Sequence, residues 1–197
     1  MIIEKFCKVT TNFYYRNPDN FESIINGGNE IRSSTGVAAS WISPLGPMTF
    51  IFSRNISNIS QVSSLTNSIK KIFKDPNYPI LIDEEGGRVC RLSKIIDNSF
   101  FNASMFGKLY DKDKKKFKSA IRTYIKNNSY ILKKLGININ TVPVLDIKRK
   151  NYHKIIGDRA YSSDPKKISI IGNFVIKEFE KNRINTVIKH IPGHGLA

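Results

Sequence analysis

Short apolar segments alternate with longer amphipathic segments along most of this chain. Short segments that contain apolar runs lie at 48–52, 79–82, 137–145 and 185–189, and we expect them to be strands buried on both faces of a sheet. Between these segments, apolar residues recur every three or four positions, which predicts amphipathic helices. Strands that alternate with helices of this length pair in parallel through right-handed crossovers, so the pattern predicts an α/β fold.

Capping residues mark the ends of the predicted helices. Asn58 and Gln61 are placed as a capping pair at the start of the first helix. A long helix is expected to end at Gly136, because glycine readily adopts the left-handed conformation that closes many helices. Asp164 followed by Pro165 predicts the start of another helix, with the aspartate as N-cap and the proline at the first helical position.

Residues 1–47 show no such clear pattern. A weak alternation at 8–15 is compatible with one strand, whereas residues 16–47 are rich in Asn, Ser and Gly and predict no helix. The chain contains no internal repeat and no low-complexity tract that would indicate an interaction tail. Regular structure is therefore expected mainly from residue 48 onward.

The net charge is +16, from 32 Lys and Arg against 16 Asp and Glu. Such an excess raises the question of a nucleic-acid or anionic-membrane partner. The densest basic run, at 112–118, lies at the start of a predicted amphipathic helix, and no arginine-rich stripe or aromatic platform accompanies it. We therefore expect solvated helix faces and no nucleic-acid partner, and keep nucleic-acid binding as a weaker alternative.

Cysteine use and the N-terminus indicate the compartment. Cys7 and Cys90 lie far apart, and two cysteines form neither a disulfide framework nor a metal site, which fits a reducing environment. The first residues, MIIEKF, contain charges where a signal peptide needs an apolar core, and no apolar stretch approaches the ~18 residues of a membrane span. A cytoplasmic protein with no membrane partner is expected.

Polar residues cluster where the predicted strands end. In a parallel α/β fold, and above all in a (β/α)₈ barrel, the carboxyl ends of the strands meet on one face and support the active site. Each of these residues taken singly could also be a helix cap or a partner for backbone N–H groups. The clusters are Arg54-Asn55, Asp83-Glu84-Glu85, Asp146 and Lys189-His190.

The cluster around residue 83 has the chemistry to hold a polyol. Asp83 with Arg88 and Arg91 offers a carboxylate and two guanidinium groups, which can bind hydroxyls through charge-assisted hydrogen bonds, although structural ion pairs are an equal alternative. Glu84 and Glu85 could suggest a glycosidase acid pair. Neighbours on a strand point to opposite sides, however, so only one of the two can face the pocket.

Two histidines close to the end of the chain lie four positions apart, as in zinc-binding helices. Pro192 and Gly193 between His190 and His194 are incompatible with a helix, so no metal site is expected. Lys189 and His190 are better interpreted as donors to a ligand oxygen. For His194 a structural role is the simpler interpretation.

Four segments match one family in order and spacing. They are IDEEGGRVCR at 82–91, PVLDI at 143–147, IGDRAY at 156–161 followed by Asp164-Pro165, and KHIPGHG at 189–195. Together with FSRN at 52–55, they resemble the β-N-acetylhexosaminidases of glycoside hydrolase family three, and the resemblance covers about residues 46–197. Glu84 stands where this family commonly has glutamine.

The resemblance implies a (β/α)₈ barrel of the family-three type, of which this chain would contain about the first five β/α units. Residues 46–197 would form this partial N-terminal barrel domain, and residues 1–45 a poorly matched N-terminal segment. An incomplete barrel leaves exposed sheet edges, through which the chain could associate with a partner.

Members of the family hydrolyse terminal β-linked N-acetylglucosamine, in bacteria chiefly in muropeptides recycled from peptidoglycan in the cytoplasm, by a retaining mechanism without a cofactor. The family's aspartate nucleophile and its histidine acid/base would both lie beyond Ala197, so the chain by itself is expected to be a truncated, inactive form. A sugar-binding or partner-associating protein without catalysis is the alternative. By motif position, the residues implied to bind the sugar are Asp83, Arg91, Arg159, Lys189 and His190.

Overall fold

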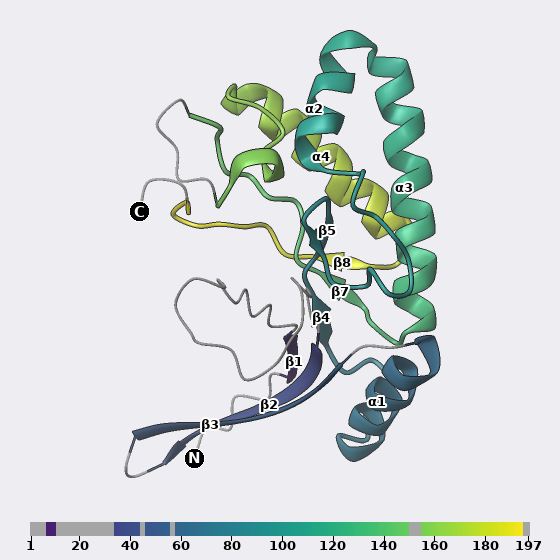
Figure 1. The fold of residues 1–197 in the computed structure, drawn as a ribbon, viewed down its shortest axis with the longest axis vertical. Coiled ribbons are helices and arrows are strands. Elements are labelled where there is room, and N and C mark those ends of the chain that lie inside the picture. Colours follow the sequence, from purple (N-terminus) through teal and green to yellow (C-terminus); the bar gives the residue numbers. More distant parts are fainter. Residues whose placement is uncertain (1–6, 11–33, 44–45, 56–57, 150–154, 195–197) are drawn as a thin grey trace, which may run out of the picture.

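The computed structural model of this chain describes residues 7–10, 34–43, 46–55, 58–149 and 155–194. Its main feature is a six-stranded sheet (Figure 1). The order of strands across the sheet is β3-β2-β1-β4-β7-β8. A second, two-stranded sheet pairs β5 with β6. The strands are β1 (Cys7–Thr10), β2 (Ser34–Ser43), β3 (Gly46–Asn55), β4 (Ile80–Ile82), β5 (Glu84–Gly86), β6 (Val89–Cys90), β7 (Ile139–Asn140) and β8 (Asn185–Thr186).

Pairing is parallel from β1 through β4 and β7 to β8, and a further parallel bridge joins Val144 to Lys189. This confirms parallel pairing for the predicted strands at 79–82, 137–145 and 185–189. The predicted strand at 48–52 lies within β3, but β3 pairs antiparallel with β2, and β2 antiparallel with β1. Parallel pairing was therefore wrong for this strand, because the connection between β2 and β3 is too short to allow a parallel crossover.

The helices are α1 (Ile59–Ile72), α2 (Ala103–Lys112), α3 (Lys114–Lys134) and α4 (Pro165–Lys181), with a short 3₁₀ helix at Gly157–Arg159. The predicted caps are confirmed. Asn58 accepts a hydrogen bond from the backbone N–H of Gln61 at 2.9 Å, and Asp164 accepts one from Lys166. Gly136 has φ +74° immediately after α3.

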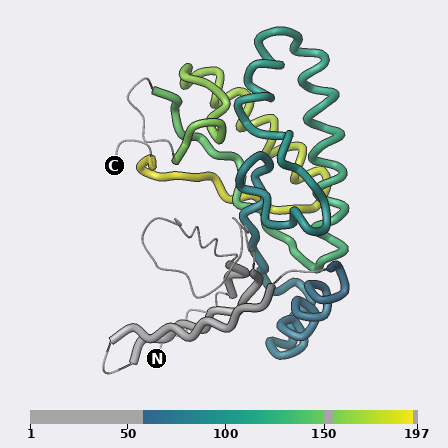
Figure 2. The backbone as a smooth tube through the Cα atoms, in the orientation of Figure 1, coloured from purple at the N-terminus to yellow at the C-terminus, as the bar shows by residue number. Residues whose placement is uncertain are grey.

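The hydrophobic core lies between the central strands and the helices. Helices α3 and α4 contact each other, and with α2 they lie together beside β4, β7 and β8 (Figures 1 and 2). Aromatic rings of α2 and α3 meet edge to face, as between Phe106 and Phe117. The largest fully buried side chains are Phe117, Phe179, Ile80, Ile82, Leu92, Ile121, Ile125, Leu132, Leu135, Ile137, Ile156 and Ile171.

These elements confirm the α/β class. The described strands form an open sheet, and both the closed (β/α)₈ barrel and its truncation stay predictions. The side chains of Arg54 and Asn55 lie outside the described part of the structure. None of the helices within the described ranges is long and apolar enough to cross a membrane.

Candidate functional site

Side chains along residues 80–85 alternate between the hydrophobic core and the opposite side of the strand. Ile80 and Ile82 of β4 are buried among the helices, and Glu84 follows them on the same side. Asp83 and Glu85 point to the opposite side, because successive side chains of a strand face opposite ways. The expectation that only one of the two neighbouring glutamates faces the site is confirmed, and that glutamate is Glu85.

Glu84 is held in the core by hydrogen bonds. Its carboxylate accepts the backbone N–H of Leu92 at 3.0 Å and the side-chain amide of Asn98 at 3.1 Å. Burial raises the pKa of Glu84, and the hydrogen bonds from Asn98 and Leu92 oppose the shift only in part. Burial, followed by the negative charge of Glu84, also raises the pKa of the nearby Cys90 thiol to about 12, so this free cysteine is unreactive.

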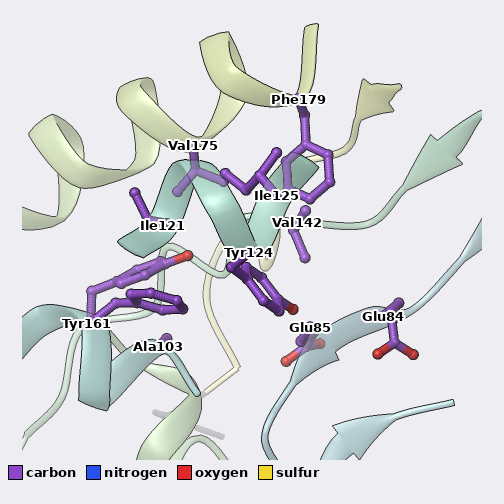
Figure 3. A pocket seen from close by; sticks show the side chains of 11 residues that line it. Glu84, Glu85, Ala103, Ile121, Tyr124, Ile125, Val142, Tyr161, Val175 and Phe179 are labelled. Atoms are coloured by element: carbon purple, nitrogen blue, oxygen red, sulfur yellow. The ribbon is translucent and has the colours of Figure 1, made fainter. Parts of the chain in front are cut away.

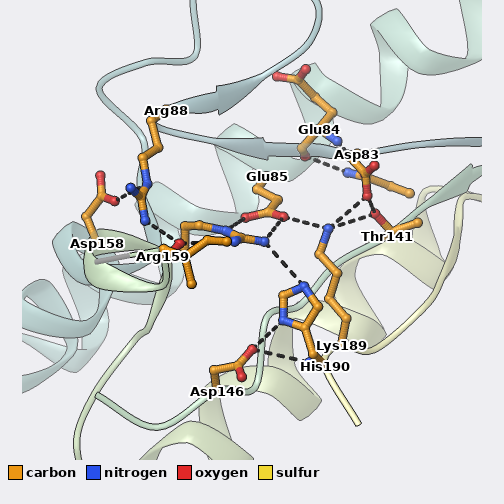
Figure 4. Close-up of polar contacts among 12 residues, drawn as sticks. Asp83, Glu84, Glu85, Arg88, Thr141, Asp146, Asp158, Arg159, Lys189 and His190 are labelled. Carbon is orange, nitrogen blue, oxygen red and sulfur yellow. Dashed lines mark hydrogen bonds and ion pairs between the residues drawn. The ribbon is translucent and has the colours of Figure 1, made fainter. Parts of the chain in front are cut away.

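The side-chain ammonium of Lys189 lies between the carboxylates of Asp83 and Glu85 (Figure 4). Its Nζ is 2.9 Å from Oδ1 of Asp83, 2.5 Å from Oε1 of Glu85 and 3.0 Å from the hydroxyl of Thr141. The Thr141 hydroxyl in turn donates to Asp83. The Lys189 side chain is only 14% exposed, so its charge is balanced by fixed carboxylates rather than by water.

Arg159, on the 3₁₀ helix, binds Glu85 through a bidentate pair. Its Nε and Nη2 donate to the two carboxylate oxygens at 2.8 and 2.9 Å. Burial alone would lower the pKa of Arg159, but the hydrogen bonds to Glu85 outweigh it and the pKa is raised. This geometry uses the planar fork that suits guanidinium to carboxylates.

His190 completes the network. Its Nε2 lies 3.4 Å from Nη2 of Arg159, and its Nδ1 lies 2.6 Å from Oδ2 of Asp146. The ring also lies against that of His194, with centroids 4.9 Å apart. The His190 side chain is 26% exposed and so can be reached from solvent.

Arg91 lies within electrostatic range of the same carboxylates. Burial lowers the pKa of its guanidinium, and the charges of Asp83 and Glu85 oppose that shift. Arg88, in contrast, forms a half-exposed ion pair with Asp158, at 3.1 Å, beside the site.

The structure thus brings Asp83, Arg159, Lys189 and His190 into one bonded network, with Arg91 in its electrostatic field. Sequence reasoning missed Glu85, the carboxylate that joins Lys189 to Arg159. The alternation along the strand was the signal that could have found it, because it puts Glu85 on the side of Asp83.

The internal cavity beneath this network is not a sugar site. It has a volume of about 20 Å³ and is lined mainly by apolar and aromatic side chains, including Phe106, Tyr124 and Tyr161, together with Glu84 and Glu85 (Figure 3). Such a volume holds about one water molecule, whereas ligand pockets measure roughly 300–1,000 Å³. A sugar bound at this end of the strands would therefore lie on the polar face and not in this cavity.

The polar face suits a ligand rich in hydroxyl groups. It combines carboxylates that accept, an ammonium and a guanidinium that donate, and an imidazole that can do either. A hydroxyl group can both donate and accept, and so can bond to two such groups at once. Within the described residues, no group of three or more His, Cys, Asp or Glu side chains could hold a metal ion.

Comparisons with known proteins agree on one family. The glycosyl hydrolase family 3 N terminal domain matches residues 41–197. A beta-hexosaminidase of Neisseria meningitidis is 32% identical over 151 residues, which are 75% of this chain and 40% of that protein. Beta-hexosaminidase A of Pseudoalteromonas piscicida is 30% identical over 149 residues, 74% of this chain and 24% of that protein.

Solved structures show the same likeness. Native NagZ from Neisseria gonorrhoeae matches with a TM-score of 0.63 and 28% identity over 73% of this chain and 41% of that one. The complex of that NagZ with N-trifluoroacetyl-D-glucosamine matches with a TM-score of 0.62, again at 28% identity, over 73% of this chain and 42% of that one. The chain spans less than half the length of each of these relatives.

Proposed function

The chain belongs to glycosyl hydrolase family 3, and from this membership we propose that it binds the terminal N-acetylglucosamine unit of β-linked glycosides as part of a β-N-acetylhexosaminidase. The observation that supports this most directly is the network of Asp83, Glu85, Arg159, Lys189 and His190 at the ends of the parallel strands. Of the five binding residues implied by the family motifs, four belong to this network: Asp83, Arg159, Lys189 and His190.

The network is suited to hold a sugar in one orientation. Glu85 holds Lys189 and Arg159 by direct ion pairs, so both cations are positioned before a ligand arrives. Preorganised charges of this kind cost little reorganisation on binding and can stabilise charge that develops in a transition state. Asp83, with a side chain 27% exposed, remains accessible as an acceptor for sugar hydroxyls.

The finer assignment follows the family. We propose retaining hydrolysis, in which the nucleophile and the acid/base pair are not supplied by the network described here, and a muropeptide substrate from peptidoglycan recycling in the cytoplasm. In this scheme the residues of this chain bind and orient the sugar. This mechanism, implied by the family resemblance, departs from the usual scheme of two flanking carboxylates. In support of it, Glu84 is turned into the core and Glu85 is paired with two cations.

Titration with N-acetylglucosamine, followed by two-dimensional NMR or calorimetry, tests the binding role. The wild-type chain should bind, and Asp83→Asn and Lys189→Met should each weaken binding by about tenfold or more, because each leaves a buried partner unpaired. The matched controls are Asp111→Asn and Lys177→Met, which change exposed residues on α2 and α4. A wild-type chain that does not bind the sugar would refute the proposed function.

Hydrolysis of an aryl N-acetyl-β-glucosaminide tests whether the chain binds the sugar without catalysing its cleavage. We expect no turnover above the buffer rate by the purified 197-residue chain. Substantial turnover that is lost in Lys189→Met would show that the described network is catalytic by itself, contrary to the proposal.

Association with a partner is the second candidate function. Strand β8 stands at one end of the described sheet, and the segment that follows it exposes Val187, Ile188 and Ile191, the last at 80%. An apolar segment beside an open strand edge favours pairing with another chain. Light scattering over a range of concentrations checks this, since a monomer at all concentrations would argue against association.

A further inference from the structure

Asp146 joins the segment after β7 to the turn that contains both histidines. Its side chain has no exposed surface. Oδ1 accepts the backbone N–H of His194 at 2.7 Å, and Oδ2 accepts that of His190 at 3.2 Å. The same Oδ2 lies 2.6 Å from Nδ1 of the His190 ring (Figure 4). Both oxygens of one carboxylate thus hold this turn.

The charge of Asp146 determines which ring nitrogen of His190 bears a hydrogen. Burial alone would raise the pKa of Asp146, but the hydrogen bonds from His194 and His190 outweigh it and hold the pKa below its ordinary value. An ionised carboxylate can only accept hydrogen bonds. Nδ1 of His190 must therefore donate.

The opposite side of the ring leads to the same assignment independently. Nε2 of His190 faces Nη2 of Arg159 at 3.4 Å. A guanidinium can only donate hydrogen bonds, and Arg159 remains charged in its pair with Glu85. In any hydrogen bond between these two groups Nε2 is the acceptor, which requires the neutral imidazole protonated at Nδ1.

We propose that Asp146 is a positioning residue that holds His190 in the Nδ1-protonated form, so that Nε2 is a hydrogen-bond acceptor for the bound sugar. The proposal rests on the proposed function for its ligand, but the state of the ring is a property of the chain alone. Neither the motif comparison nor the strand-end pattern assigns this role to Asp146.

This assignment has a consequence for specificity. The cation next to Nε2, Arg159, only donates, whereas Nε2 only accepts. A free sugar hydroxyl can accept from a cation and donate to Nε2 at the same time. An ether or a fluorine at the same carbon can accept only, and would leave Nε2 without a partner.

The ring state can be measured directly. The chain contains three histidines, His153, His190 and His194, and long-range ¹H–¹⁵N correlation spectra distinguish protonated from unprotonated ring nitrogens. Spectra are recorded at about pH 8, where an ordinary imidazole is neutral. His190→Gln identifies the signals of His190. We expect a protonated Nδ1 and an unprotonated Nε2.

Asp146→Asn tests whether Asp146 is what keeps Nδ1 of His190 protonated. The amide has one accepting oxygen where the carboxylate uses two, so its NH₂ group must face either the His194 N–H or the His190 ring. We expect His190 to shift partly or wholly to the Nε2-protonated form. Asp158→Asn, which changes an acid paired with Arg88 away from the ring, should leave the His190 signals unchanged.

Two results would overturn the proposal. One is an Nε2-protonated His190 in the wild-type chain, which decides the matter even if Asp146→Asn does not fold. The other is a folded Asp146→Ala variant, which offers the ring no acceptor, whose His190 signals match those of the wild type.

Sugar binding gives a separate readout. Among N-acetylglucosamine analogues with single hydroxyls replaced by fluorine, at least one should bind the wild-type chain about tenfold more weakly than the parent sugar. This penalty should shrink in Asp146→Asn. Equal binding of all analogues would overturn the acceptor role of Nε2. Failure of N-acetylglucosamine itself to bind would count against the proposed function and leave the result on the ring state intact.

Discussion

Glu85 and Arg159 lie 74 positions apart in the sequence and face each other through two hydrogen bonds, of 2.8 and 2.9 Å. The pair ties the β5–β6 hairpin to the 3₁₀ helix at Gly157–Arg159. Because Glu85 also contacts Lys189, one carboxylate neutralises two cations that come from distant parts of the chain.

Glu85→Gln should therefore destabilise the fold as well as the site. The variant leaves Arg159 and Lys189, whose side chains are 12% and 14% exposed, without their shared counter-charge. We expect the free energy of unfolding at pH 7 to fall by about 3 kcal/mol, measured by urea denaturation. Asp158→Asn breaks the half-exposed pair with Arg88 and should cost less than about 1 kcal/mol. Equal losses in the two variants would contradict a structural role for Glu85.

Glu84→Gln should have the opposite effect on stability. Burial raises the pKa of Glu84 in the folded state, so ionising it costs stability as the pH rises from the unfolded pKa toward the folded value. Glutamine avoids this cost, and Asn98 can turn its amide to match. We expect the variant to gain about 1 kcal/mol or more at pH 7.5 and little at pH 4.

Urea denaturation at the two pH values checks this, with Glu180→Gln on the exposed face of α4 as the control. A Glu84→Gln variant destabilised equally at both pH values would mean that the hydrogen bonds to the carboxylate outweigh its desolvation.

Asp146→Asn should alter the acid side of the stability profile. Hydrogen bonds lower the folded pKa of Asp146, so its stabilisation is present above the unfolded pKa and is lost as the pH falls through the folded value. We expect a loss of about 2 kcal/mol at pH 7 that narrows below about pH 4. Thermal unfolding from pH 3 to 8 measures this difference. A loss that is constant over the whole range would exclude the charge of Asp146 as its source.

Gly136→Ala should destabilise the end of α3. Gly136 has φ +74°, and a Cβ there would lie 2.5 Å from the hydroxyl oxygen of Thr66. That hydroxyl is buried and donates to the carbonyl of Leu135 at 2.6 Å, so it cannot move away freely. We expect a loss of more than about 1 kcal/mol.

A double-mutant cycle separates the backbone strain at residue 136 from the steric contact with the Thr66 hydroxyl. In the Thr66→Ala background the contact with the hydroxyl is removed, while the backbone strain and the 3.1 Å approach to the Cβ of residue 66 remain. Gly136→Ala should therefore cost less there than in the wild-type chain. The same cost in both backgrounds would mean that contact with the Thr66 hydroxyl contributes nothing.

Local signals were enough to predict the long helices. Asn58, Gly136 and Asp164 act within one turn of the helix they limit, so their effects depend little on the rest of the fold. The strands at 79–82 and 185–189 were recognised from local signals as well, because each contains a short apolar run that follows a helix.

Elements that depend on tertiary contact were missed. Helix α2 contains Gly107, which lowers helix propensity, yet a Cβ at this position would lie 1.8 Å from the carbonyl oxygen of Tyr161. The close approach of these two backbones requires the glycine, and the sequence alone does not show that approach. Strand β2 is stabilised by its antiparallel partners, and its Ser- and Ala-rich sequence is not strongly typical of a strand.

The site was predicted in part for a comparable reason. Strand ends indicate where Asp83 and Lys189 must come together, because parallel strands end at one edge. Alternation shows that Glu84 and Glu85 differ in direction, but only the burial of Ile82 decides which of them enters the core. The contact between Asp146 and His190 depends on the path of the turn at 189–194 and has no local signal.

Register, rather than residue type alone, determines what residues 80–86 do. Two asparagine side chains fix that register. Asn138, just before β7, accepts the backbone N–H of Ile80. Asn140, in β7, accepts the backbone N–H of Glu84 and donates to the carbonyl of the same residue. Even-numbered positions therefore belong to the core and odd-numbered positions to the face that carries the polar network. A substitution in this segment changes one side chain, but an insertion or deletion of a single residue would reverse the parity and exchange the two glutamates. We therefore expect insertions and deletions in this segment to be tolerated less well than substitutions.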